Sequence, residues 1–457
     1  MTRSRRPFPD SPVALPPNLQ FVLALSPSVM TLGLDHMRAL MERVGHPERR
    51  FRSVLVAGTN GKGSTTTMLA AILGAHGLRT GRYTSPHVFN VAERITIDGA
   101  HASIEEMEVA AARLVPLRDE IPFSYFEALT AIAFMVFAAR GVEVAVLEVG
   151  LGGRLDATNI VEPDVSIVTS ISLDHRRILG DTEEQILVEK LGVSRPGVPL
   201  LVGPLPDALR AVVNDRAKRD GFPVFDLENI GRVSQVEEAF DGIAFRVETP
   251  HAEYGRVSIP FAGSHQVTNA LLAIGAAERM LPALVGLGGA LARAYIPGRF
   301  ERVERGGRSF VIDVAHNEAS LVATADHLAA FRPRDECAIV FGLMHRKELF
   351  EAPRHLLAAA SCLCLIEPPS EPGSTDNAFA PHELWARYFA PLLPDSATNV
   401  MLWNPSGPRA DAMRRLVRWL DRSRYSTVVA TGSHRVVEDF GLLLQTSTVE
   451  EGGNTSK

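Results

Sequence analysis

The glycine-rich segment GTNGKGST, residues 58–65, most constrains the fold of this chain, because it stands between a predicted strand and a predicted helix. The strand is FRSVLVAG at 51–58, and the helix, GSTTTMLAAILGAHG, follows at 63–77. Glycines let a backbone wrap around a phosphate, which the first N–H groups of the helix then face. Lys62 is placed to reach the terminal phosphates of a nucleotide, and a nearby hydroxyl to bind Mg²⁺. Because an extra glycine separates Lys62 from the next serine, a glycine turn with a solvated lysine is the alternative.

Beyond this segment, apolar strands continue to alternate with helical patterns. Strands are predicted at 142–150 and 164–171, and helices at 125–140 and 181–193, the last capped by Asp181. Such alternation indicates an α/β fold with a mostly parallel sheet and helices on both faces. A short antiparallel excursion is predicted at 240–261.

A second, smaller α/β domain is predicted after AYIPGRF at 294–300, which we interpret as a hinge. The alternation restarts there, so we place a domain boundary near residue 298. Strands are predicted at 309–316, 337–343, 361–368 and 427–434, and helices at 317–331 and near 348–358.

The composition of the 457-residue chain excludes several classes of protein. With 46% hydrophobic and 22% charged residues it is typical of a globular enzyme, and a net charge of −6 argues against a nucleic-acid partner. No apolar run is long enough to cross a membrane, so we expect no membrane partner. Three cysteines, at 337, 362 and 364, are too few for a disulfide framework, and we expect a cytoplasmic location.

Several polar side chains follow predicted strands, where doubly wound folds bind their ligands. Glu148 ends the strand at 142–150 and is a candidate Mg²⁺ ligand, although many such carboxylates only cap a helix. His175, in SLDH, is either a metal ligand or a hydrogen-bonded loop histidine. In the second domain the corresponding residues are Asp313, His316 and Ser433, each of which is also compatible with an ordinary helix N-cap.

Two further positions depend on context. The loop GLGGRLDATN at 150–159 carries Arg154 and Asp156, which either contact a substrate or form a surface ion pair of little energetic weight. Lys190 lies on the predicted helix at 181–193, where a solvated lysine is the ordinary interpretation.

The order of these segments over about residues 20–445 resembles the folylpolyglutamate synthases and dihydrofolate synthases of the Mur ligase superfamily. The resemblance is carried by LGLDHMRALMERVGHP, VAGTNGKGST, YTSPH, NVAERITIDG, FSYFEALTAIAF, AVLEVGLGGRLDATN, LDH, GSHQVTNA, PGRFE, DVAHN and TGS. It implies a P-loop ATP-binding ligase domain at 19–298 and a smaller C-terminal α/β ligase domain at 299–457. Residues 1–18 are expected to form a disordered arm, and the active site to lie between the domains.

The resemblance also implies roles for individual residues. Lys62, Lys190 and His316 are implied to be catalytic. The implied ATP-binding residues are Gly58, Thr59, Asn60, Gly61, Lys62, Gly63, Ser64, Thr65, Asn269, Arg299 and Asp313. Two Mg²⁺ ions are implied, with Ser64, Ser85, Glu148, His175 and carbamylated Lys190 around them. The implied substrate-binding residues are Arg154, Asp156, His316 and Ser433.

The sequence departs from the family pattern at three places. The family usually has Asp-Lys-Asp where this chain has residues 346–348, Arg-Lys-Glu, and a Pro-Arg pair near 367–383, which contains no Lys or Arg. His175 is followed by two arginines rather than by uncharged residues. These changes concern the amino-acid side of the site. Arg346 either replaces the lost cation or lies in a solvent-facing loop.

From this resemblance we expect an ATP-dependent, ADP-forming amide ligase that adds L-glutamate to dihydropteroate, to folates or to both, through an acyl phosphate. Two metal ions and Lys62 would neutralise charge on the transferred phosphoryl group. A closed, dry site between two domains would protect the acyl phosphate from hydrolysis. The alternatives are a paralogous ligase with another acid or amino acid and a non-ligase P-loop ATP-binding protein. Small-molecule substrates and a monomer are expected.

Overall fold

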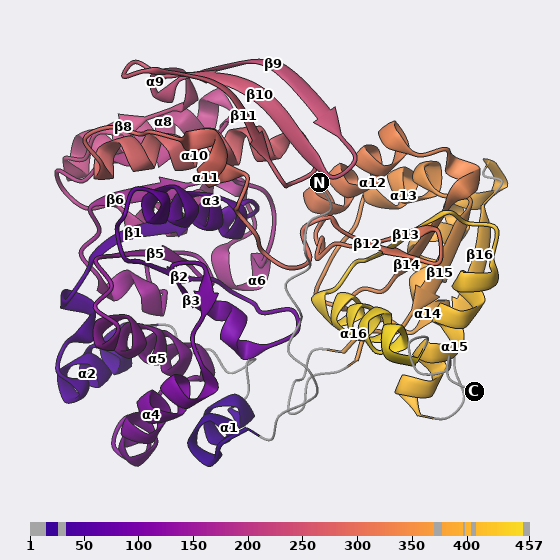
Figure 1. Cartoon of the computed structure of the whole chain (residues 1–457), viewed down its shortest axis with the longest axis horizontal. Helices are drawn as coiled ribbons and strands as arrows, with labels where there is room; N and C mark the ends of the chain where they lie inside the picture. Colours follow the sequence, from indigo (N-terminus) through magenta and orange to yellow (C-terminus); the bar gives the residue numbers. More distant parts are fainter. Residues whose placement is uncertain (1–14, 26–32, 370–376, 396–397, 404–407, 451–457) are drawn as a thin grey trace, which may run out of the picture.

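Two sheets organise the molecule (Figure 1). The computed structural model describes residues 15–25, 33–369, 377–395, 398–403 and 408–450. An eight-stranded sheet is built from the first half of the chain, and a six-stranded sheet lies in the C-terminal part. The structure confirms the predicted α/β class. In the part of the chain that is described, no helix has the length and apolar character needed to cross a membrane.

The eight-stranded sheet is parallel except for a hairpin at one edge. Its order is β4-β3-β2-β5-β1-β6-β7-β8, with β3 antiparallel to both β2 and β4. The central strands are fully buried, which is why they are continuous apolar runs in the sequence. The strands are β1 (Arg52–Ala57), β2 (Thr80–Tyr83), β3 (Ile95–Ile97), β4 (Ala100–His101), β5 (Val144–Glu148), β6 (Val165–Val168), β7 (Leu200–Val202) and β8 (Val224–Phe225).

Helices cover both faces of this sheet and divide its core into two apolar clusters. One cluster packs α2 (Asp35–Val44), α4 (Ile104–Leu114) and α5 (Tyr125–Ala139) against one face. The other packs α3 (Lys62–Ala75), α10 (His265–Met280) and α11 (Leu287–Leu291) against the opposite face. The remaining helices of this part are α1 (Pro17–Ala24), α6 (Arg176–Leu179), α7 (Glu183–Lys190), α8 (Asp207–Asp220) and α9 (Leu227–Ile230).

The predicted antiparallel excursion is a three-stranded sheet in the order β11-β10-β9. It consists of β9 (Arg232–Ala239), β10 (Gly242–Glu248) and β11 (Glu253–Ile259). It therefore begins earlier than the predicted residue 240, because β9 is a mostly exposed edge strand without an apolar run. Apolar residues of β10 and β11 join the cluster around α3 and α10.

The six-stranded sheet has the order β12-β13-β17-β14-β15-β16, and only β12 is antiparallel. Cys362 and Cys364 are buried in β15 and carry free thiols. The strands are β12 (Glu301–Arg305), β13 (Arg308–Ile312), β14 (Cys337–Phe341), β15 (Cys362–Ile366), β16 (Asn399–Trp403) and β17 (Thr427–Thr431). The helices are α12 (Glu318–Phe331), α13 (Ala352–Ala359), α14 (Pro381–Leu384), α15 (Arg409–Arg422) and α16 (His434–Glu450).

Three element boundaries differ from the prediction. Helix α7 is capped by Thr182, not by Asp181, because Thr182 and Gln185 form a reciprocal capping box. Helix α13 begins at Ala352 rather than near 348. Helix α1 begins at Pro17, so the last two residues of the predicted arm are helical, and residues 1–14 lie outside the described residues.

Parallel register brings the carboxyl ends of three neighbouring strands to one edge of the first sheet. Val56 of β1 pairs with Glu148 of β5, and Ala57 pairs with Val168 of β6. The glycine-rich loop, Glu148 and the segment from Thr169 therefore start side by side, at the edge where doubly wound folds bind ligands.

Candidate active site

Two glycines of the phosphate loop occupy positions that no other residue would fit. Gly58 has a φ of 144° and Gly61 a φ of 86°. A Cβ at Gly58 would lie 1.9 Å from Thr169 Oγ1, and a Cβ at Gly61 would lie 2.3 Å from Asn269 Oδ1. The loop is thus packed between the segment after β6 and helix α10, and α3 begins directly after it at Lys62.

Two lysines converge on the carbonyl of Gly58. Lys62 Nζ donates to Gly58 O at 3.0 Å and to Thr59 O at 3.1 Å. Lys190 Nζ, from the end of α7, donates to Gly58 O at 2.8 Å. Burial lowers the pKa of Lys62, and burial together with the charge of Lys62 lowers the pKa of Lys190 to about 7. Lys190 is therefore not the solvated helix lysine of the ordinary interpretation, and part of it is a neutral amine near pH 7.

Glu148 ends β5 beside the loop and does not cap a helix. It is 3% exposed, and its Oε2 accepts the backbone N–H of Ser85 at 3.1 Å. Burial raises the pKa of this carboxyl, and the charge of Lys62 opposes the increase. A buried carboxylate beside a phosphate loop has the chemistry of a metal ligand.

The segment after β6 is held against the phosphate loop by hydrogen bonds. Ser170 Oγ accepts the N–H of Asn60 at 3.0 Å, and the N–H of Ser172 donates to Thr59 Oγ1 at 3.2 Å. His175 follows with a left-handed φ of 50° and directly precedes α6. Burial lowers the pKa of His175 to about 3, so that its imidazole is neutral and can donate an electron pair.

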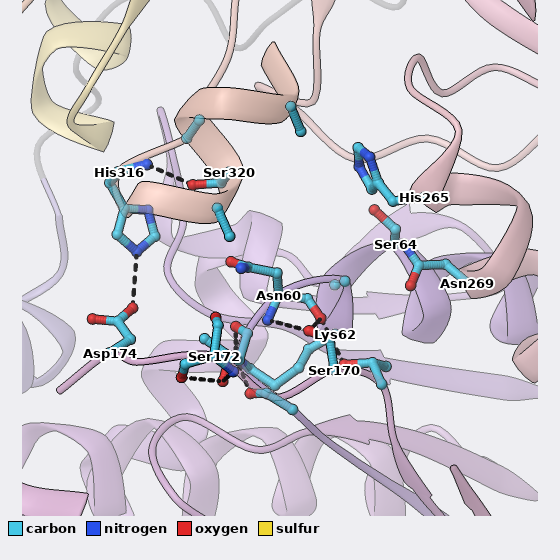
Figure 2. A pocket seen from close by; sticks show the side chains of 18 of the residues that line it. Asn60, Lys62, Ser64, Ser170, Ser172, Asp174, His265, Asn269, His316 and Ser320 are labelled. Carbon is cyan, nitrogen blue, oxygen red and sulfur yellow. Dashed lines mark hydrogen bonds and ion pairs between the residues drawn. The ribbon is translucent and has the colours of Figure 1, made fainter. Parts of the chain in front are cut away.

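The C-terminal part contributes the loop after β13. His316 Nδ1 lies 2.8 Å from Val314 O, so this nitrogen carries the proton and Nε2 is left as an acceptor. Burial, with the charge of Lys347, lowers the pKa of His316 to about 3. Figure 2 shows the His316 ring pointing at Asp174, whose Oδ2 is 4.0 Å from Nε2.

Asp313 organises this loop from within. Its Oδ2 accepts the N–H of Phe300 at 2.7 Å, and its Oδ1 accepts from Ala315 N and Thr324 Oγ1, both at 3.0 Å. Asp313 therefore connects the predicted hinge at 294–300 to the loop that carries His316.

A buried ion pair joins the two parts of the protein across the site. Lys347 Nζ donates to Asp174 Oδ1 at 2.6 Å, and the two side chains are 6% and 10% exposed. Asp174 also accepts the amide of Asn317 at 3.1 Å and the N–H of His175 at 2.8 Å. Burial raises the pKa of Asp174, but the charge of Lys347, within hydrogen-bond distance, holds it well below its ordinary value. The carboxylate is therefore ionised and fully engaged.

Two of the places where the sequence departs from the family pattern, the arginines after His175 and the segment 346–348, also face each other. Arg176 Nη1 lies 3.1 Å from Glu348 Oε2, so an arginine after His175 is matched by a glutamate in the segment 346–348. Both side chains are about half exposed, so the pair contributes little stability. The interpretation of 346–348 as a solvent-facing loop is wrong for Lys347 and holds only for its exposed neighbours.

A cavity of ≈480 Å³ lies between the two parts of the protein, and the phosphate loop, Glu148, Asp174, His175, Lys190 and His316 line it. Figure 2 shows Asn60, Lys62 and Ser64 of the phosphate loop and α3 beneath the loop of His316. The predicted residues that line the cavity are Gly58, Thr59, Asn60, Gly61, Lys62, Gly63, Ser64, Ser85, Glu148, His175, Lys190, Asn269, Arg299, Asp313 and His316.

Four predicted residues lie outside the cavity lining. Thr65 is buried in α3, and Ser433 is buried at the start of α16, where its Oγ accepts the N–H of Arg435. Arg154 pairs with Glu189 at 2.9 Å on the surface. Asp156 is 6% exposed and accepts from Thr158 and from the N–H of Leu151. The alternative of an Arg154–Asp156 surface pair is therefore wrong.

Sequence reasoning missed Asp174, Asn317 and Lys347 as parts of the site. Asp174 stands in SLDH and Asn317 in DVAHN, so both were adjacent to residues that the motifs pointed to. Lys347 stood in the segment 346–348, which was noted only for its charge changes, and its partner is 173 residues away in the chain. Ser172 was also missed, and its buried Oγ has no hydrogen-bond partner among the described residues.

The residues implied to bind Mg²⁺ form an incomplete but suitable donor set. The described part of the chain contains no group of three or more His, Cys, Asp or Glu side chains that would hold a metal. Around the cavity, Glu148 supplies one carboxylate and Ser64 one hydroxyl, and a carbamate on Lys190 would supply a second anionic group. Mg²⁺ is commonly bound through one or two carboxylates, water and substrate phosphates. The residues present fit that kind of site.

Comparisons with known proteins agree with this geometry. The model of the Mur ligase middle domain matches residues 56–277, and that of the Mur ligase, glutamate ligase domain matches residues 298–434. The dihydrofolate synthase/folylpolyglutamate synthase of Bacillus subtilis is 34% identical over 329 residues, or 69% of this chain and 76% of that protein. The protein of the same name from Escherichia coli is 32% identical over 354 residues, or 76% and 80% of the two chains.

Solved structures show the same similarity over almost the whole chain. Escherichia coli FolC in complex with DHPP and ADP is 26% identical with a TM-score of 0.81, and the match covers 96% of this chain and 100% of that one. Mycobacterium tuberculosis folylpolyglutamate synthase, complexed with ADP and AMPPCP, is 29% identical with a TM-score of 0.77 and coverage of 90% and 95%. The chain belongs to the dihydrofolate synthase/folylpolyglutamate synthase family of Mur ligases.

Proposed function

We propose that this protein is an ATP-dependent, ADP-forming amide ligase that adds L-glutamate to dihydropteroate, to folates or to both. The observation that carries the proposal is the shared cavity. A phosphate loop with Lys62 and Glu148 faces a neutral histidine, His316, that comes from the other part of the chain. Membership of the family supports the same reaction.

In the first half-reaction the chain binds and orients ATP. The loop at 58–65 and Lys62 hold the phosphates, and Asn269 and Arg299 hold the rest of the nucleotide. Lys62 leaves its two carbonyl partners and neutralises charge on the γ-phosphoryl group as it passes to the substrate carboxylate. When bound by Ser64, Ser85, Glu148, His175 and carbamylated Lys190, two Mg²⁺ ions would supply further charge neutralisation at the phosphates.

In the second half-reaction an amine attacks the acyl phosphate. Glutamate attacks as its free amine, and once the new bond makes the nitrogen acidic, its proton passes to His316 Nε2, the acceptor nitrogen of the ring. As the amine nitrogen bonds to the acyl carbon, the bond from that carbon to the bridging oxygen breaks, and phosphate leaves and takes up the proton from His316. Asp174 lies 4.0 Å from Nε2 and stabilises the imidazolium that forms. Arg154, Asp156 and Ser433 remain proposed substrate contacts, made after the two parts of the chain rearrange around the ligands.

The domain division is proposed at residues 298 and 299, because the second sheet begins with β12 at Glu301. The monomeric state and the cytoplasmic location stay predictions.

Release of ADP, measured with and without dihydropteroate plus glutamate, tests the proposal. We expect release that requires both the acid and the amino acid, with dihydropteroate and reduced folates compared as acids. ADP release that needs a different acid or amino acid would favour the paralogous ligase. Release that neither substrate affects would favour a P-loop ATP-binding protein without ligase activity and would overturn the proposal.

A further inference from the structure

A second cavity lies on the other side of the predicted hinge from the active site. It has a volume of ≈1090 Å³ and is lined by α3, by β2 with the β3–β4 hairpin, and by residues 293–297. We call it the hinge cavity. Its volume exceeds that of the active-site cavity and is slightly above the usual range of small-molecule sites, about 300–1,000 Å³. None of the residues assigned to the proposed ligase reaction lines it.

Three arginines give the hinge cavity its charge. Arg79 and Arg293 are exposed on its wall, and within the described residues neither guanidinium has a hydrogen bond or an ion pair. Arg82 is 7% exposed, and its Nη1 donates to Thr67 Oγ1 at 3.0 Å and to Tyr295 O at 2.9 Å. Its Nε is buried and has no partner among the described residues. An orphaned donor on a buried guanidinium is costly and favours an acceptor nearby.

The two carboxylates of the hinge cavity, Glu93 and Asp98, offset only part of the charge of its three arginines. Both oxygens of Glu93 are engaged by backbone N–H groups of residues 88–90, at 2.8–2.9 Å. Asp98 accepts the N–H of Thr80 at 2.8 Å. The cavity therefore offers cationic donors, whereas its carboxylates are already hydrogen-bonded.

The hinge cavity and the active site are lined by different residues of the same structural elements. On α3, Gly63 and Ser64 line the active site, and Thr67 and Gly74 line the hinge cavity. Across them runs the segment that leads from α11 to β12 (Figure 1). A Cβ at Gly63 would lie 3.0 Å from Ile296 Cδ1 and 3.6 Å from Arg299 Nη2. A ligand that held residues 293–297 against α3 would thus also fix Ile296 and Arg299 against the phosphate loop.

We propose that the hinge cavity binds a small polyanion, a metabolite with two or more carboxylate or phosphate groups, and that this ligand changes turnover by fixing the hinge. The binding step does not depend on the proposed ligase activity. Two kinds of ligand carry several such groups, an oligo-γ-glutamyl chain and a polyphosphate. Tri-γ-glutamate and tripolyphosphate are the probes that distinguish them.

Calorimetric titration of the full chain, with AMPPCP and Mg²⁺ saturating the nucleotide site, tests the binding step. The double variant Arg79→Ser/Arg293→Ser removes two exposed charges and should fold normally. Gly74→Leu fills the cavity without changing its charge, because a Cβ there meets only Thr80 Oγ1 at 4.0 Å. Arg232→Ser/Arg246→Ser is the charge-matched control, with both arginines exposed on β9 and β10.

We expect one probe to bind the wild-type protein with a dissociation constant below about 1 mM. The double variant and Gly74→Leu should each weaken that binding at least tenfold, and the control should change it less than twofold. The bound probe should also change the kcat of ADP release at least twofold in the wild type and in the control, but not in the double variant or in Gly74→Leu. Failure of both probes to bind, or equal binding by wild type and double variant, would overturn the site. Binding with unchanged kcat would overturn the effect on turnover. Absence of ADP release with every substrate would instead overturn the proposed ligase, and leave the titration unaffected.

Discussion

Replacing Lys347 with methionine should weaken the contact between the two parts of the protein, because it leaves the Asp174 carboxylate buried without its cation. The two charged atoms are 2.6 Å apart, and the side chains are 6% and 10% exposed. At that distance two unit charges attract by about 6 kcal/mol with an effective dielectric constant of about 20. Loss of one partner of a buried pair typically costs about 3–5 kcal/mol. Asp174 keeps the donors of His175 and Asn317, so we expect the lower end of that range.

Urea unfolding of a double-mutant cycle measures this effect. The proteins are the wild type, Lys347→Met, Asp174→Asn and the double variant, with Lys218→Met on α8 as an exposed lysine control. A chain with two sheets need not unfold in one step, so the cycle compares the transition that Lys347→Met shifts. The double variant should be more stable than Lys347→Met, because it leaves no unpaired charge. A coupling energy below about 0.5 kcal/mol would refute the reasoning.

Four further changes test other parts of the structure. Lys62→Ala should lower kcat by about 10²-fold or more without changing the circular dichroism spectrum, and a near-normal kcat would remove Lys62 from phosphoryl transfer. Lys190→Ala should be inactive and regain part of its activity with added acetate, which replaces a carbamate, whereas full activity without acetate would show that no carbamate is needed. Arg346→Ala should raise the KM for glutamate and leave the KM for ATP unchanged, because this exposed cation adjoins Lys347 at the amino-acid side. Glu106→Gln should cost about 0.5 kcal/mol of unfolding free energy at pH 7, because glutamine keeps the capping box with Ser103 and only the charge that pairs with Arg140 is lost. The Ser103 N–H and Arg140 lower the pKa of Glu106 in the folded chain, so its contribution is complete above the unfolded value, and the difference between the two proteins should shrink as pH falls below it.

The strands and helices that frame the site follow from local sequence. A strand buried on both faces must be apolar along its length, so β1, β5 and β6 are visible as continuous runs. The glycines of the phosphate loop are visible for the same local reason, because their backbone conformations and close neighbours allow little else. Edge strand β9 had no such pattern, and its beginning was placed several residues too late.

Caps and pairs were harder to predict, because several residues satisfy the same local rule. Asp181 and Thr182 are both good N-cap residues, and only the position of Gln185 in space decides for Thr182. Arg154 and Asp156 have opposite charges two residues apart, yet the loop turns Asp156 inward and leaves Arg154 with Glu189. Sequence spacing carries no information about which of the two faces the interior.

The contacts that join the two parts around the active site were the hardest to predict from the sequence. Their polar chemistry explains why they leave no sequence pattern, and it also explains how they allow the site to open. Asn60 with Asn317, Asp174 with Lys347, and Arg176 with Glu348 are polar pairs between distant segments. Each group regains hydrogen bonds to water when the site opens, so separation costs less than exposure of an apolar interface of the same area. A ligase must admit three substrates and then exclude water from a reactive acyl phosphate. An interface of engaged polar groups meets both needs, because it opens readily and yet fixes Asp174 and His316 when closed. Such pairs produce no apolar periodicity in the sequence, so the closed site can be recognised only in the folded structure, where the segments come together.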